Sequence, residues 1–81
     1  MPYVRQERRE ELDNGAMPAT SGDLNYLITC QVKTYLEGHG TSYTIINDII
    51  GALEGAKIEF YRRIAEPYEN TKIVANGDVY P

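Results

Sequence analysis

The sequence predicts an all-α fold: a helical hairpin with a long second helix and short helical arms at both ends, assembled as a homo-oligomeric bundle. Apolar residues recur at helical spacing over residues 21–37 and 42–66, and a glycine-flanked turn, Gly38 to Gly40, separates the two segments. The stretch "LNYLITCQVKTYL" does not sustain the period-two alternation of a strand. We therefore expect one helical domain over residues 1–81.

The chain is short and acidic. Folding 81 residues removes only about 60% of the unfolded surface from water, so the core is expected to be thin. A hydrophobic content of 42% still lies in the globular range, which argues against wholesale disorder. The formal charge of -4 is a poor match to a phosphate backbone and disfavours generic DNA or RNA binding.

Residues 1–20 are expected to form a variable N-terminal arm and a loop. Alternating Arg and Glu residues favour a short solvated helix before Asp13, with Tyr3, Val4 and Leu12 as its only apolar anchors. This arm should dock weakly or on a partner chain. The following "DNGAMPATSG" has the composition of a loop.

The first main helix is expected over residues 21–37, capped by a residue between Ser21 and Asp23 and stopped at Gly38. At 100 degrees per residue its apolar positions fall on one face, the expected core face, and three others point away from it. The core face comprises Leu24, Leu27, Ile28, Val32 and Tyr35; the outward positions are Tyr26, Cys30 and Lys33.

The second helix, residues 42–66, should begin at an N-cap on Ser42 and run to Pro67, which forces an end or a kink. Its length of about 35 Å exceeds the roughly 30 Å diameter of a compact globule of this size, so it either protrudes or is covered by another subunit. One apolar stripe should face the first helix: Ile46, Ile49, Ile50, Leu53, Phe60 and Ile64, with Lys57 among them.

Residues 67–81 should add one or two helical turns ending at Gly77, followed by a tail.

A second surface of this helix is neither strongly apolar nor fully polar. It comprises Asn47, Gly51, Glu54, Ile58 and Arg62, with Gly55 at its edge. A glycine within a helix costs about 1 kcal/mol relative to alanine, so Gly51 and Gly55 require a compensating close contact. That contact could be a bulky side chain of the first helix, a helix of another subunit, or a flat ligand.

The strongest candidate for a ligand site is the run from Phe60 to Arg63, because guanidinium groups beside aromatic rings suit planar anions such as nucleotides. The alternative is that Arg62 and Arg63 only pair with Glu59, Glu66 or Glu69 at the surface. Arg62 is the better candidate, since it lies on the second surface. The predicted ligand-binding residues are Tyr61, Arg62, Tyr68, Gly51, Glu54, Ile58 and Asn47.

No catalytic role, metal or cofactor is predicted. The chain has one histidine and one cysteine, His39 and Cys30, which is too few for a zinc site. Lys57 should extend its head to solvent or pair with Glu54 or Asp23. The longest apolar stretch is too short for a bilayer, and the lone cysteine fits a reducing cytoplasm.

Four segments together resemble a family of small proteins of unknown function encoded by bacteriophages, prophages and their bacterial hosts. They are "MPYV", "GDLNYLIT", "SYTIINDIIGALEGAKIEFYRRIAEPYE" and "NGDVYP". Gly55 departs from the family pattern, which has Cys or another small residue there. The resemblance implies a phage-associated protein in the cytoplasm of a bacterial host.

Small phage proteins without catalytic residues often act by binding a target in stoichiometric amounts. This analogy gives two hypotheses. The first is a non-enzymatic, self-associating protein that binds and sequesters a small anionic ligand, such as a nucleotide signal of host immunity. The alternative is an interaction module that occludes a host protein, or a structural accessory.

Overall fold

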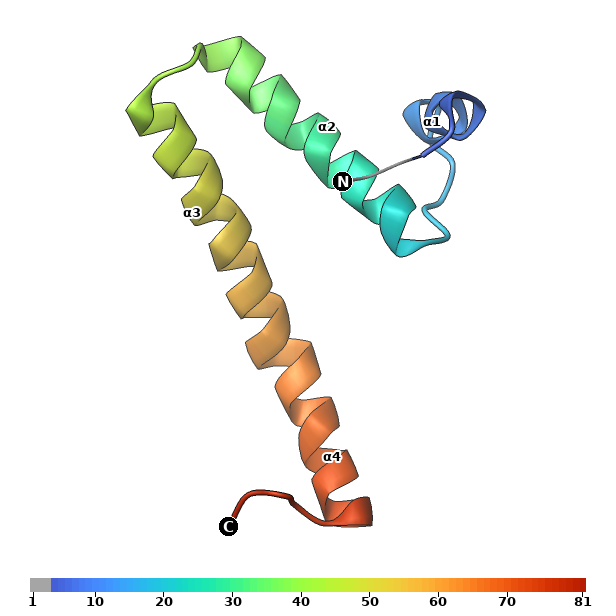
Figure 1. Cartoon of the computed structure of the whole chain (residues 1–81), viewed down its shortest axis with the longest axis vertical. Coiled ribbons are helices and arrows are strands. Elements are labelled where there is room, and N and C mark those ends of the chain that lie inside the picture. The colour runs from blue at the N-terminus through green and yellow to red at the C-terminus, as the bar shows by residue number, and fades with distance from the viewer. Residues whose placement is uncertain (1–3) are drawn as a thin grey trace. The chain divides into compact units, whose positions relative to one another are not determined.

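A computed structural model describes residues 4–81 and contains helices but no strand within that range (Figure 1). The elements are α1 (Gln6–Asp13), α2 (Ser21–His39), α3 (Tyr43–Phe60), the π-helical turn η1 (Tyr61–Ala65) and α4 (Glu66–Asn76). The all-α prediction is therefore confirmed. The internal contacts divide the chain into two units, the residues up to Ile45 and Ile46–Pro81, which are described separately. The predicted hairpin packing, the single domain and the oligomer stay predictions.

In the first unit, α1 lies against α2, and Leu12 is buried between them with 3% of its surface exposed. Val4 is half-buried, and Tyr3, the other predicted anchor, lies outside the described residues. The N-terminal arm thus docks on its own chain. Because Leu12 is the one apolar residue of α1, this docking depends on a single side chain and on polar contacts.

The main polar contact between these helices joins Arg8 of α1 to Asp23 of α2. Arg8 donates to Asp23 Oδ2 from Nε at 3.1 Å and from a terminal nitrogen at 2.8 Å, and the Ala19 N–H donates to the same oxygen at 2.9 Å. Thr20 accepts from the Asp23 N–H at 3.0 Å and is the N-cap of α2. The predicted cap between Ser21 and Asp23 is therefore one residue too late. Within the first unit, Asp23 is engaged by Arg8.

Acid should weaken this contact within a defined pH range. The Arg8 guanidinium, followed by the Ala19 N–H, lowers the pKa of Asp23 from 3.8 to about 2. A carboxyl group with a lowered pKa stabilises the fold fully above its ordinary pKa and loses that contribution as the pH falls through the lowered value. We expect the difference in melting temperature between wild type and Asp23→Asn to shrink from pH 4 to pH 2 and vanish below it, measured by circular dichroism. A constant difference over this range would contradict the assignment.

The face of α2 that is covered in this unit differs from the predicted one. Tyr26 and Cys30, predicted to point outward, are half-buried, and the Tyr26 hydroxyl donates to Asp13 Oδ1 at 2.9 Å. Of the predicted core positions, Leu27 and Val32 are half-buried and Leu24, Ile28 and Tyr35 are exposed within this unit, and the packing of that face on the second helix stays a prediction. The prediction took the most apolar face as the buried one. It did not foresee that α1, which has a single apolar residue, would cover the face of α2 that carries Tyr26, through hydrogen bonds.

Helix α2 ends two residues later than predicted. It passes through Gly38 to His39, and Gly40, at φ +80°, donates its N–H to the Leu36 carbonyl at 2.8 Å. A positive φ favours glycine, so Gly40 and not Gly38 provides the stop.

The second helical segment begins as predicted but continues through Pro67. The Ile45 N–H donates to Ser42 Oγ at 3.2 Å, which confirms the cap. At η1 the Glu66 N–H donates to the Tyr61 carbonyl, five residues back, so the helix widens just before the proline. A proline ring clashes with the carbonyl four residues earlier in an ordinary α-helix, and this wider turn makes room for it. Pro67 therefore does not end the helix, which runs as α4 to the predicted stop at Gly77, φ +85°.

The second unit consists of one uninterrupted helical run and leaves its apolar side chains in contact with solvent. No residue of α3, η1 or α4 is buried. Phe60, Ile64 and Tyr68 are 63%, 57% and 61% exposed. A single helix has no second element with which to cover its own apolar stripe.

Candidate functional site

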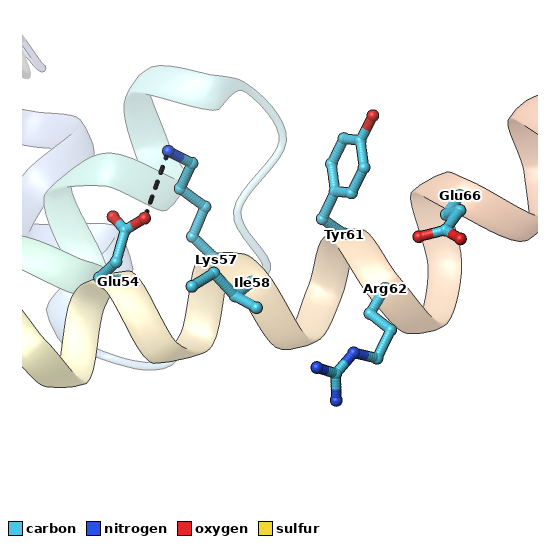
Figure 2. Close-up of a pocket in the computed structure, with 6 residues that line it drawn as sticks. All are labelled: Glu54, Lys57, Ile58, Tyr61, Arg62 and Glu66. Atoms are coloured by element: carbon cyan, nitrogen blue, oxygen red, sulfur yellow. Dashed lines mark ion pairs between the residues drawn. The ribbon is translucent and has the colours of Figure 1, made fainter.

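A shallow hollow of about 300 Å³ lies on the surface of the second unit, beside the η1 turn (Figure 2). The last turns of α3 supply three of its lining side chains, η1 two, and the first position of α4 one. The lining residues are Glu54, Lys57, Ile58, Tyr61, Arg62 and Glu66. Four of the seven predicted site residues, Glu54, Ile58, Tyr61 and Arg62, thus come together.

The hollow has a cationic and an aromatic edge. Figure 2 shows Lys57 and Tyr61 on one side of the helix and Arg62 on the other, with Ile58 between them along the ribbon. Arg62 is therefore not stacked on Tyr61. A flat ligand lying over Ile58 would meet the tyrosine ring along one edge and the guanidinium group along the other.

The two adjacent arginines differ in their partners. Arg63 donates from Nε to Glu59 Oε1 at 2.6 Å, as expected for a surface ion pair. Arg62 makes no side-chain hydrogen bond or ion pair with any residue in the described range, 4–81. The alternative that both arginines only pair with surface carboxylates thus fits Arg63 alone. Arg62 keeps its donors available to a ligand.

The remaining charges of the hollow nearly balance. Lys57 Nζ lies 3.7 Å from Glu54 Oε1, and both side chains are mostly exposed, so this pair is weak. Glu66 opposes Arg62 in sign. A bound anion would therefore first contact Arg62. It would contact Lys57 as well only if Lys57 left its ion pair with Glu54.

Tyr61 is held by a contact across the π turn. Its hydroxyl donates to Glu69 Oε2 at 3.3 Å, eight residues later in the chain. The negative charge of Glu69, then this hydrogen bond, raises the pKa of Tyr61, with smaller contributions from burial and Glu66. Tyr61 therefore stays neutral near pH 7 and acts as a hydrogen-bond donor beside the hollow.

The other three predicted residues do not line the hollow. Tyr68 is exposed, with the Lys72 ammonium 5.5 Å from its ring centroid. Asn47 and Gly51 lie further towards the start of α3. In the second unit nothing approaches within 4 Å of the place where a Cβ would stand on Gly51 or Gly55. The close contact that these glycines were expected to make stays a prediction.

Two lining residues, Lys57 and Glu66, were not predicted as part of the site. Lys57 lies one turn before Tyr61, and that spacing was a usable signal. Glu66 lies one turn after Arg62, so the same spacing was a usable signal for it.

Residues 4–81 contain neither a metal-binding cluster nor a membrane-spanning helix. No group of three or more His, Cys, Asp or Glu side chains could hold a metal ion there. Within the same range, no helix is long and apolar enough to cross a membrane.

Fold and site together define a small all-helical protein with an exposed amphipathic helix and a mixed-charge hollow on it. The chain matches the family described as a domain of unknown function, DUF6899, over residues 1–79, and it belongs to that family. The predicted membership of an uncharacterised family is thereby confirmed, while the phage origin stays a prediction. No curated protein and no solved structure matches the chain.

Proposed function

We propose that this protein is a non-enzymatic binding protein that takes up a small planar anion of the nucleotide class in the hollow at η1. The observation that carries the proposal is the guanidinium of Arg62 beside Ile58 and Tyr61, which has no ion-pair or hydrogen-bond partner among residues 4–81. Planar donors of this kind bind phosphate oxygens with two hydrogen bonds, and an apolar floor favours the face of a base.

Binding would proceed through three contacts. A phosphate group meets Arg62, and the base lies over Ile58 with its edge towards the Tyr61 ring. A second phosphate then competes with Glu54 for Lys57. Because Glu66 and Glu54 oppose the negative ligand, a single copy should bind weakly, in the micromolar range. Sequestration by such a site requires the protein in stoichiometric amounts.

The sequence resemblance to phage-encoded proteins suggests the biological setting. In the cytoplasm of an infected bacterium, an abundant small protein that holds a nucleotide signal would lower its free concentration and blunt host immunity. The local basic group at the hollow is sufficient for this role even though the whole chain is acidic, since one small ligand meets only its immediate surroundings.

The second candidate function is a protein-interaction module that occludes a host factor. The observation in its favour is the exposed apolar side of the second unit, which includes Phe60, Ile64 and Tyr68. Exposed apolar patches of this kind mark interaction surfaces.

The test compares Arg62→Ala with Arg63→Ala, a matched control one residue away whose guanidinium is already paired with Glu59. A hydrogen bond to a charged group contributes about 1.5–3 kcal/mol, so Arg62→Ala should weaken binding roughly 10- to 100-fold. The probe is a panel of mono-, di- and cyclic nucleotides, screened by thermal shift and measured by calorimetry.

Arg63→Ala should retain the wild-type affinity. If no nucleotide raises the melting temperature of the wild type, the proposal is wrong. In that case, recovery of one stoichiometric host protein on the purified chain would favour the interaction module instead.

A further inference from the structure

The end of the second helical segment carries three large apolar side chains without cover. Phe60, Ile64 and Tyr68 follow at four-residue intervals across η1, and each is more than half exposed. Four-residue spacing keeps side chains on roughly one side of a helix. These three residues are named the distal stripe.

Helix α2 is too short to cover the whole distal stripe. At about 1.5 Å per residue, the helical run from Tyr43 to Asn76 measures about 50 Å, whereas the 19 residues of α2 measure about 28 Å. Only residues 40–42 separate the two, so α2 laid back along α3 would reach no further than about Tyr61. Ile64 and Tyr68 lie beyond that point.

Helix α1 cannot supply the missing cover either. It has eight residues, or about 12 Å of length, and its sole apolar side chain is Leu12. Leu12 is already buried in the first unit. In the second unit, the tail side chains Val79 and Tyr80 are themselves 95% and 81% exposed. Among the described residues the distal stripe is therefore open to a partner from another molecule.

We infer that this partner is the distal stripe of a second copy, lying antiparallel with Ile64 at the two-fold axis. Phe60 and Tyr68 lie four residues before and four residues after Ile64. In an antiparallel pair, each Phe60 therefore faces Tyr68 of the second copy, and Ile64 faces Ile64. A two-fold interface requires such a self-complementary surface, and aromatic pairs add to the stability of the contact.

The charges near the stripe favour the antiparallel arrangement. A parallel pair would place Lys57 against Lys57 and Lys72 against Lys72, whereas the antiparallel pair places them opposite Thr71 and Ala56.

This register creates one like-charged pair, Glu59 opposite Glu69. Both carboxylates already have partners of their own, Arg63 for Glu59 and the Tyr61 hydroxyl for Glu69. Their mutual repulsion is therefore reduced.

The apolar area that two distal stripes can bury sets the expected affinity of the dimer. Full burial of an aromatic side chain removes about 150–250 Å² from water, so the six side chains of two distal stripes supply roughly 700 Å² at their present exposure. A standard stable interface buries about 1,600 Å² in total. The pair should therefore dissociate in the micromolar range and show a concentration-dependent mass.

The first test is disulfide trapping in a Cys30→Ser background, which removes the single native thiol. Ile64→Cys should form a covalent dimer under mild oxidation, because its two copies meet at the axis. The matched control is Leu53→Cys: its exposed position lies opposite Ala75 in this register and should not link to itself. Equal trapping of both variants would indicate a parallel pair and overturn the inference.

The second test uses the mass in solution, measured by light scattering from about 1 to 100 µM. The wild type should shift from monomer to dimer over this range, and Ile64→Glu should stay monomeric. Tyr43→Glu, a control at an 87% exposed position at the start of α3 that faces no residue in this register, should dimerise like the wild type. A wild type that stays monomeric throughout would exclude a second copy as the occupant. Nucleotide binding is measured separately, so either result leaves the Arg62 test intact.

Discussion

Leu12→Ala should release α1 from α2. Leu12 is 3% exposed and is the one apolar side chain that α1 contributes. Truncation of a buried leucine costs about 2–5 kcal/mol, and the loss should fall near 2–3 kcal/mol here because the thin core can partly close over the gap. An eight-residue helix is not stable alone in water, so α1 should unfold once it is released.

Hydrogen exchange measures this effect locally. The amides of α1 should lose their protection in Leu12→Ala, while those of α3 keep theirs, and the helical circular dichroism should fall by the contribution of α1. Arg9→Ala is the matched control, since Arg9 is exposed on the same helix and alanine favours helix. Protected α1 amides in Leu12→Ala would show that the contact of Arg8 with Asp23 alone holds the helix.

The helices themselves were predictable because their signals are local. Ser42 caps through its own hydroxyl, and Gly77 ends α4 through its own positive φ. The errors arose where a tertiary contact decided the outcome. Tyr26 looked solvent-facing on a helical wheel, but its hydroxyl reaches Asp13 of α1, a residue 13 positions earlier that no periodicity connects to it.

The candidate site was predictable in part for the same reason. Glu54, Ile58 and Arg62 share one side of α3 at four-residue spacing, so an α-helical wheel groups them correctly. After Tyr61 an α-helical wheel assigns side chains to the wrong side of the helix. The reason is that the π turn η1, which accommodates Pro67, contains one residue more than an α-helical turn. The place of Glu69 beside Tyr61 results from that change of phase.

Pro67→Ala should therefore stabilise the helix and separate Glu69 from the Tyr61 hydroxyl at once. Proline inside a helix costs about 3 kcal/mol relative to alanine, and the π turn relieves part of this cost. With alanine, ordinary α-helical hydrogen bonds can form throughout, and the stability of the second unit should rise by about 1–3 kcal/mol. The same change would rotate α4 by roughly a quarter of a turn relative to α3, carrying Glu69 away from the Tyr61 hydroxyl.

Tyr61 reports this rotation directly. Its pKa is raised mainly by Glu69, so in Pro67→Ala the pKa should fall back towards 10.0, which NMR titration of labelled tyrosine can measure. Pro18→Ala is the matched control, because it removes a proline from the loop before α2 and leaves η1 unchanged. If the Tyr61 pKa stays raised in Pro67→Ala, the π turn is imposed by something other than the proline. If it falls and nucleotide affinity falls with it, the wider turn that accommodates Pro67 is also what shapes the binding hollow.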